Sequence, residues 1–271
     1  MIIHKKPEKA LAVKNAVVTI GSFDGVHFGH RAIIDSLKAK AEETGGETVI
    51  VTLFPHPRKV LNLDTANFRL LNSLEEKEFL IERCGVGHLV ELEFTEAFSR
   101  ISYEDFVKEV LVGQLHAKAV VVGYNHHFGH NRDGNFQKLQ RLGLQAGFDV
   151  IEIPKHDIDK EKISSTTIRA ALQRGDIETA NKFLEYPYFF FSPIDTEGFL
   201  QITESLKLIP PKGKYQVEIL TFNFSINGIR KSGIGISLIE AEDLGSSIII
   251  IVFFLEVSSG FFILIIVCLT Y

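Results

Sequence analysis

Over the first two thirds of the chain, short continuous apolar runs alternate with segments in which apolar residues recur every three or four positions. The continuous runs, rich in Val and Ile, predict strands that are buried on both faces of a sheet. These runs are Ala16–Ile20, Thr48–Phe54, His88–Phe94, Ala119–Gly123 and Asp149–Pro154. The periodic segments predict helices at Gly29–Glu43, Leu74–Cys84, Tyr103–Leu115, Asn135–Ala146, Ser165–Gln173 and Ile177–Leu184. Strand–helix alternation predicts right-handed crossovers and an α/β fold with a Rossmann-like, doubly wound parallel sheet.

The pattern changes between Glu185 and Pro193, where Phe189–Phe191 run together and helix formers become rare. We therefore expect two domains, residues 1–186 and residues 187–271, the second a small, truncated antiparallel β domain. The last segment, residues 246–271, is strongly apolar and has a single charged residue, Glu256. It is open to three interpretations: a hairpin around a Ser-Ser-Gly turn, a membrane anchor, or a frayed, aggregation-prone tail. The strand preference of Ile, Val and Phe favours the hairpin, as does the cost of a central glutamate in lipid.

Composition narrows the classes of protein to be considered. The 29 Lys and Arg residues against 34 Asp and Glu give a net charge of −5, so a nucleic-acid partner is not expected. The two cysteines, Cys84 and Cys268, are too few for a disulfide framework and favour a reducing compartment. The start, Met-Ile-Ile-His-Lys-Lys, lacks the apolar run of a secretory signal, so we expect a cytoplasmic protein. The sequence gives no expectation for the oligomeric state.

Ligands of doubly wound sheets bind beyond the carboxyl ends of the strands. The first predicted strand is followed there by GSFDGVHFGH, residues 21–30, whose glycines permit tight turns and close approach. His27 and His30 can face one side of the first helical turn, where free N–H groups favour anions. Such a set suits the charge of a phosphoryl-transfer transition state. Two alternatives stay open: an ordinary helix start, and a zinc site with His56 as third ligand.

Three further motifs lie after later strands or open a helix. In Phe54-Pro55-His56-Pro57 the prolines are expected to stop a helix and to hold His56 at the edge of the sheet. The polar loop at residues 124–134 contains three histidines, and the sequence does not indicate which of them faces inward. Residues 163–169, Ile-Ser-Ser-Thr-Thr-Ile-Arg, suit a polyphosphate. The corresponding structural alternatives are a turn with an exposed histidine, a solvated loop, and a plain helix cap with a surface arginine.

Together GSFDGVHFGH, FPHP, VVVGYNHHFG and ISSTTIR resemble the adenylyltransferase half of the bacterial bifunctional riboflavin kinase/FMN adenylyltransferases, the FAD synthetases. The resemblance covers roughly residues 12–188. It implies a nucleotidyltransferase fold of the HxGH type that uses ATP and FMN as substrates. The implied reaction transfers AMP from ATP to FMN, giving FAD and pyrophosphate, without a covalent intermediate. Mg²⁺ would be the cofactor, held mainly by the phosphates rather than by protein side chains.

The resemblance also implies a role for each matching residue. The implied catalytic residues are His27, His30, Asn125 and Arg169. The implied ATP-binding residues are Gly21, Ser22, Phe23, Asp24, Gly29, Ser164, Ser165 and Thr166. The implied residues on the phosphate and FMN side are His56, Pro57 and Phe128. No general base is needed, because the second pKa of the FMN phosphate is about 6.

The second part of the chain departs from the family. The Pro-Thr-Ala-Asn signature of the kinase half does not occur, although Leu208–Val217 resembles a later barrel strand. We therefore expect kinase activity on riboflavin to be absent. Two other functions stay open: a non-catalytic flavin-nucleotide-binding paralogue, and an adenylyltransferase for another acceptor, such as nicotinamide mononucleotide or phosphopantetheine. The complete set of motifs in the first part favours the FMN adenylyltransferase over both.

Overall fold

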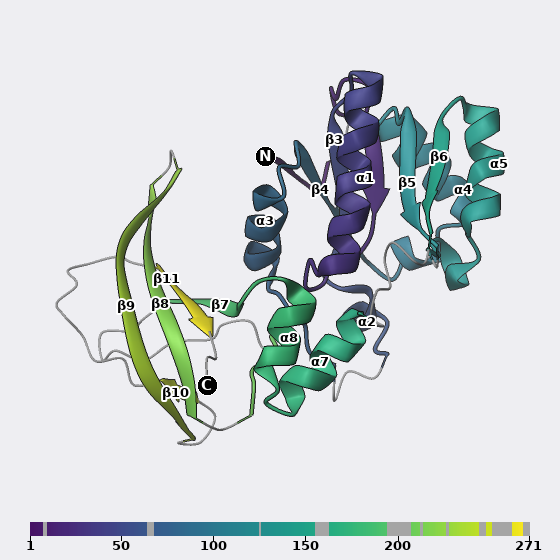
Figure 1. Ribbon diagram of the computed structural model, residues 1–271. Coiled ribbons are helices and arrows are strands. Elements are labelled where there is room, and N and C mark those ends of the chain that lie inside the picture. Colours follow the sequence, from purple (N-terminus) through teal and green to yellow (C-terminus); the bar gives the residue numbers. More distant parts are fainter. Residues whose placement is uncertain are drawn as a thin grey trace. The chain divides into compact units, whose positions relative to one another are not determined.

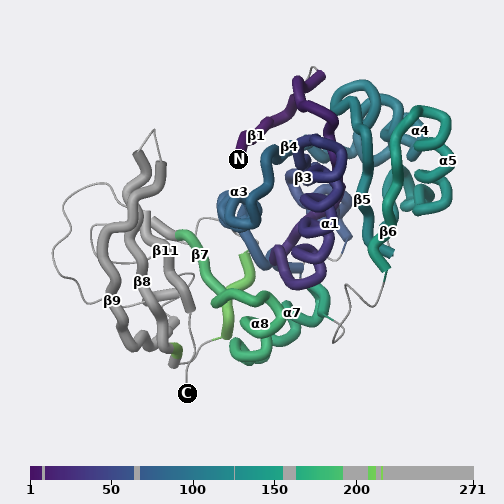
Figure 2. The backbone as a smooth tube through the Cα atoms, turned by 45° about the horizontal axis from the view of Figure 1, so that its top comes forward, coloured from purple at the N-terminus to yellow at the C-terminus, as the bar shows by residue number. Residues whose placement is uncertain are grey.

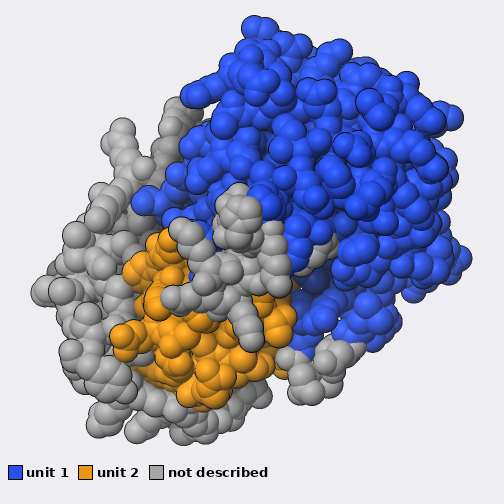
Figure 3. All heavy atoms as spheres, turned by 45° about the vertical axis from the view of Figure 1, so that its right-hand side comes forward, with its two compact units in different colours: residues 1–68, 77–163 blue, residues 69–76, 164–271 orange. Residues whose placement is uncertain are grey.

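The computed structural model describes residues 1–7, 10–63, 68–124, 126–154, 163–193, 207–211, 214–225, 228–243, 248–250 and 262–267. The chain divides into two compact units (Figure 3). Unit 1 comprises residues 1–68 and 77–163, and unit 2 comprises residues 69–76 and 164–271. The domain boundary at residues 186/187 stays a prediction.

Unit 1 is built on a parallel sheet of six strands (Figure 1). The strands are β1 (Ile2–Lys5), β2 (Val17–Ile20), β3 (Thr48–Phe54), β4 (His88–Glu93), β5 (Ala119–Gly123) and β6 (Asp149–Ile153). Their order is β1-β4-β3-β2-β5-β6, so the chain leaves β2 first toward β3 and later toward β5. This confirms the predicted Rossmann-like α/β class. The point where the strand order reverses, beside β2, is where such sheets bind ligands.

Both faces of this sheet are covered. On one face Val18, Val51 and Val120 pack in a cluster with Phe106 and Leu111. The main helices of the unit are α1 (Phe28–Thr44), α3 (Leu74–Arg83), which begins in unit 2, α4 (Tyr103–Phe106), the π-helix η2 (Val107–Gln114) and α5 (Phe136–Ala146). Helix α1 contacts β2, β3 and β5, and Figure 2 shows it lying across the sheet. The continuous apolar strands are therefore buried on both faces of the sheet, as the sequence predicted.

The described residues of unit 2 include the helices α7 (Ser165–Gln173) and α8 (Ile177–Leu184) and an antiparallel sheet. The strands are β7 (Tyr188–Pro193), β8 (Lys214–Ser225), β9 (Gly228–Asp243), β10 (Ile248–Ile250) and β11 (Phe262–Val267), in the order β10-β9-β8-β11-β7. The predicted small antiparallel β part is present in the region that the structure describes.

The apolar C-terminal segment forms strands, but the predicted hairpin is wrong for its described residues. β10 pairs with β9, whereas β11 lies between β8 and β7 and pairs with both. A central position gives β11 hydrogen-bonded neighbours on both edges, which a two-stranded hairpin does not provide. The Ser-Ser-Gly turn lies outside the described residues. Among the described helices, none is both long and apolar enough to cross a membrane.

Candidate functional site

The loop after β2 has an unusual backbone. Phe23 and Val26 have positive φ angles of 47° and 36°, and Gly25 has a φ of 93°. A positive φ is rare for any side chain and rarest for a β-branched one such as Val. Phe23 and Val26 are almost fully buried, at 1% and 0% exposure, so packing holds the loop in this shape. A Cβ on Gly21 would lie 3.1 Å from the Phe23 ring, which explains the glycine there.

This loop brings His27 and His30 together at the start of α1. Their rings stack with centroids 3.9 Å apart, and the Phe23 ring lies 5.0 Å from that of His30. His27 is the N-cap residue, but its side chain makes no capping hydrogen bond. The first turn of α1 therefore offers backbone N–H groups and partial positive charge beside two imidazoles. Such a place favours a phosphate group.

His30 is held in its neutral form. Burial lowers its pKa well below the ordinary value, and the nearby His27 and Lys77 lower it further. The Nδ1 atom of His30 is buried and has no hydrogen-bond partner among the described residues. A neutral imidazole has one N–H donor and one acceptor nitrogen. In this form His30 can offer one N–H donor to a phosphate oxygen.

His56 follows the carboxyl end of β3, as predicted, but the prediction that its flanking prolines stop a helix is wrong. Pro57 begins the short helix α2 (Pro57–Val60), because the first position of a helix needs no N–H donor. The Nδ1 atom of His56 accepts a hydrogen bond from the Arg58 amide at 3.2 Å, so the imidazole caps this helix. Its ring also lies 4.9 Å from that of Phe68.

Of the three histidines in the loop after β5, His126 is the one that faces inward. His126 stacks on Phe128, with ring centroids 5.6 Å apart. Burial lowers the pKa of His126 to about 4, with smaller contributions from His127 and Arg132. Phe128 is buried against Phe106, at a centroid distance of 5.8 Å. His127 and His130 are exposed, and Asn125 lies outside the described residues.

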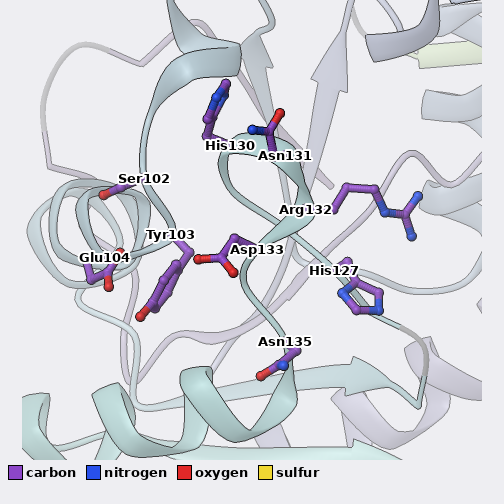
Figure 4. Close-up of a pocket in the computed structure, with 9 residues that line it drawn as sticks. All are labelled: Ser102, Tyr103, Glu104, His127, His130, Asn131, Arg132, Asp133 and Asn135. Carbon is purple, nitrogen blue, oxygen red and sulfur yellow. The ribbon is translucent and has the colours of Figure 1, made fainter.

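A polar pocket of about 670 Å³ adjoins this loop (Figure 4). Its wall combines the start of α4 with residues on both sides of Phe128 in the loop after β5. The lining residues are Ser102, Tyr103, Glu104, His127, His130, Asn131, Arg132, Asp133 and Asn135. Its volume is in the range of small-molecule sites. The sequence pointed to the polar loop at residues 124–134, which contains Arg132, but not to Tyr103, which belongs to no motif.

The Ile-Ser-Ser-Thr-Thr-Ile-Arg motif lies at the start of α7, in unit 2. The Ser164 hydroxyl accepts from the Thr167 amide at 3.2 Å, and the Ser164 amide donates to the Thr167 hydroxyl at 3.0 Å. This capping box accounts for the Ser164 hydroxyl structurally. Arg169 is half-buried rather than a surface arginine, and its Nε donates to the Arg69 carbonyl at 2.7 Å within the same unit. Ser165 and Thr166 occupy the first helical turn.

The zinc alternative finds no support in the described part of the chain. It contains no group of three or more His, Cys, Asp and Glu side chains placed to hold a metal ion. His27, His30 and His56 all belong to that part. The Nδ1 atom of His56 also accepts the capping hydrogen bond, so this nitrogen is not available to coordinate zinc.

Sequence reasoning missed a buried lysine behind the loop after β2. Lys77, on α3, is 6% exposed, and its ammonium donates to the Thr52 hydroxyl at 3.3 Å. The sequence did contain one indication: Lys77 precedes the buried Leu80 and Ile81 by three and four positions. This spacing places it on the apolar face of the helix. A charged residue on an apolar stripe conflicts with the local pattern, and such conflicts tend to mark functional sites.

Comparison with known proteins places the chain in a family. The family model described as FAD synthetase matches residues 9–167. The bifunctional riboflavin kinase/FMN adenylyltransferase of Listeria monocytogenes is 33% identical over 248 residues, which cover 86% of this chain and 76% of that protein. The protein of the same description from Escherichia coli K12 is 31% identical over 216 residues, covering 76% and 69%.

A structural comparison agrees with the architecture. A solved structure described as a macrolide-efflux protein from Streptococcus pneumoniae matches with a TM-score of 0.75, over 98% of this chain and 90% of that chain. Because the two sequences are 21% identical, this likeness shows the fold alone.

Proposed function

The chain belongs to the FAD synthetase family and is a nucleotidyltransferase, and we propose that it transfers the AMP part of ATP to FMN. The products are FAD and pyrophosphate. The observation that carries this proposal is the stacked His27–His30 pair at the start of α1. Two imidazoles beside uncapped helix N–H groups fit the phosphates of a nucleoside triphosphate.

The reaction requires placement and charge neutralisation. An oxygen of the FMN phosphate attacks the α-phosphorus of ATP. The bond from that phosphorus to the oxygen that bridges to the β-phosphorus breaks, and its electron pair leaves with pyrophosphate. The attacking oxygen carries no proton near pH 7, since the second phosphate pKa is about 6. Neutral donors such as His30 then stabilise the negative charge that builds on the phosphoryl oxygens.

The remaining roles follow the family resemblance. Gly21, Ser22, Phe23, Asp24 and Gly29 would line the ATP side, with Ser164, Ser165, Thr166 and Arg169 holding the triphosphate. Both the hydroxyl and the amide of Ser164 take part in the capping box, so a phosphate oxygen bound by Ser164 would compete with these hydrogen bonds. Mg²⁺ would be held mainly by the phosphates of ATP, whose charge it neutralises.

The acceptor side would lie along the loop after β5. His56, Pro57, Asn125 and Phe128 are the residues that the resemblance assigns to catalysis or to the phosphate and FMN side. The polar pocket beside this loop supports that placement, because exposed Arg132 and His127 offer positive or donor groups to FMN. We further propose that riboflavin kinase activity is absent, on the ground that the Pro-Thr-Ala-Asn signature does not occur.

The first test is chromatography of purified protein incubated with FMN, ATP and Mg²⁺. FAD and pyrophosphate are expected in equal amounts. His30→Ala is expected to lower turnover by about a hundredfold or more, the usual effect of losing one transition-state donor. His116→Ala is the matched control, because His116 is exposed and belongs to no motif.

The outcomes separate the competing functions. Near-normal activity of His30→Ala would remove His30 from the catalytic role. Binding of FMN without pyrophosphate release would favour the non-catalytic paralogue. Pyrophosphate release with nicotinamide mononucleotide or phosphopantetheine, and none with FMN, would favour another acceptor.

A further inference from the structure

Helix α3 carries a positive charge on its buried face. Leu80 and Ile81 are 5% and 0% exposed, and Lys77 lies on the same face at 6% exposure. A buried ammonium costs free energy unless hydrogen bonds and opposite charges compensate it. The partners of Lys77 therefore decide what this charge contributes.

Those partners lead to the loop after β2. The Lys77 ammonium donates to the Thr52 hydroxyl at 3.3 Å, and that hydroxyl donates to the Ser22 carbonyl at 3.4 Å. Asp24, in the same loop, is 1% exposed. Burial lowers the pKa of Lys77, while Asp24 is the carboxylate that most strongly raises it. A hydrogen-bond chain and an opposite charge thus connect α3 to this loop.

The loop needs such support. Its positive φ angles at Phe23 and Val26 are conformations that persist only where the surroundings hold them. Packing of the two side chains supplies part of this restraint. The hydrogen bonds from Lys77 to Thr52 and from Thr52 to Ser22 restrain the loop backbone at Ser22. Ser22 lies immediately before the turn that leads to His27.

Lys77 also acts on His30 through its charge. Burial has the larger effect on the pKa of His30, and the charges of His27 and Lys77 lower it further. The charged groups that face Lys77 are Asp24, Glu91 and Glu78. Removing the ammonium would therefore let His30 take up a proton at a higher pH.

We propose that Lys77 is a positioning residue of the adenylyl-transfer site, which fixes the Ser22–Asp24 loop through Thr52 and Asp24. The expected effect on turnover rests on the proposed function, whereas the expected effect on the pKa of His30 does not.

The charge effect is tested without turnover by NMR titration of the histidine ring protons, with the His30 signal assigned from His30→Gln. In Lys77→Met the pKa of His30 is expected to rise by about half a unit or more. Lys38→Met is the matched control, because it removes an exposed lysine from α1, the helix that carries His30. If Lys77→Met does not fold, Lys77→Gln removes the same charge and keeps a donor toward Thr52. An unchanged His30 pKa in the folded variant overturns the electrostatic role.

The positioning effect is tested by kinetics on the folded variants. Lys77→Met is expected to lower kcat for FAD formation about tenfold or more, and to move the acid limb of the pH profile upward. Thr52→Val cuts the hydroxyl link and keeps the charge, so kcat should fall severalfold while the acid limb stays in place. Wild-type kcat in both variants overturns the positioning role. If the unmodified chain makes no FAD, the proposed function fails, and the titration still decides whether Lys77 controls His30.

Discussion

At the scale of single residues, His126 links the loop after β5 to the stability of unit 1. Its folded-state pKa is about 4, against an ordinary value of 6.5. The unfolded chain therefore binds the proton more readily, and stability is lost as pH falls from 6.5 toward 4. This difference in pKa between the folded and the unfolded chain corresponds to up to about 3 kcal/mol of unfolding free energy. His126→Phe should keep the stacking on Phe128 and remove this loss.

Urea unfolding of both proteins between pH 7 and pH 4 measures the effect. The wild-type protein should lose more stability over this range than His126→Phe does. His30 and His4 also have lowered pKa values, so the variant should keep part of the acid sensitivity. Identical pH dependence in the two proteins would contradict a half-buried, neutral His126.

Residue-level prediction worked where spacing implies geometry. His27 and His30, three positions apart at a helix start, were expected on one side and stack there. The inward histidine of the loop after β5 was beyond prediction, because an irregular backbone gives no periodicity from which to infer direction. The partners of Lys77 were equally hidden, since Thr52 and Asp24 come from distant parts of the sequence.

At the scale of elements, a buried ion pair holds unit 2 together. The Lys207 ammonium lies 2.6 Å from the Glu76 carboxylate, with side-chain exposures of 1% and 2%. It also donates to the carbonyls of Leu71 and Phe189, at 2.7 and 2.9 Å. Glu76 in turn accepts from the Phe191 amide at 2.8 Å. Three separate segments of the sequence thus meet at one pair of charges.

Removing one partner of this pair should cost more than removing both. Lys207→Met leaves the Glu76 carboxylate buried without its cation, and we expect it to lower the unfolding free energy by about 3–5 kcal/mol. Glu76→Gln combined with Lys207→Met removes both charges and keeps an acceptor for the Phe191 amide, so it should recover part of this loss. Denaturant unfolding followed by circular dichroism gives the comparison. A double variant as unstable as the sum of the single variants would show that the two charges are not coupled.

Element prediction succeeded where burial sets the pattern and failed where it does not. β5, which is buried throughout, and β3, which is buried except at its last two residues, have the predicted bounds. β1 was missed because it is a short edge strand and largely exposed. The helix predicted at Tyr103–Leu115 is present but changes from α to π at Val107, a difference in hydrogen bonding that side-chain spacing barely reflects.

At the scale of the whole molecule, strand order determines where the chemistry lies. β2 has β3 on one side and β5 on the other, so the loops after these three strands open at one edge of the same sheet. Those loops carry GSFDGVHFGH, FPHP and the histidine-rich segment. Alternating strands and helices were enough to predict this edge. The pairing of β11 was not predictable, because an apolar strand is equally suited to a hairpin or to the middle of a sheet.

The relatives are described as riboflavin kinases as well as FMN adenylyltransferases, and we expect this chain to lack the kinase activity. Phosphoryl transfer to riboflavin requires groups that cradle Mg·ATP, and the Pro-Thr-Ala-Asn signature of the kinase half does not occur in this chain. Incubation with riboflavin, ATP and Mg²⁺ should therefore yield neither FMN nor FAD. Formation of FAD by the same preparation supplied with FMN is the control, because it shows that the protein is folded and active. Any FMN formed from riboflavin would mean that other residues of the chain hold the nucleotide for the kinase reaction.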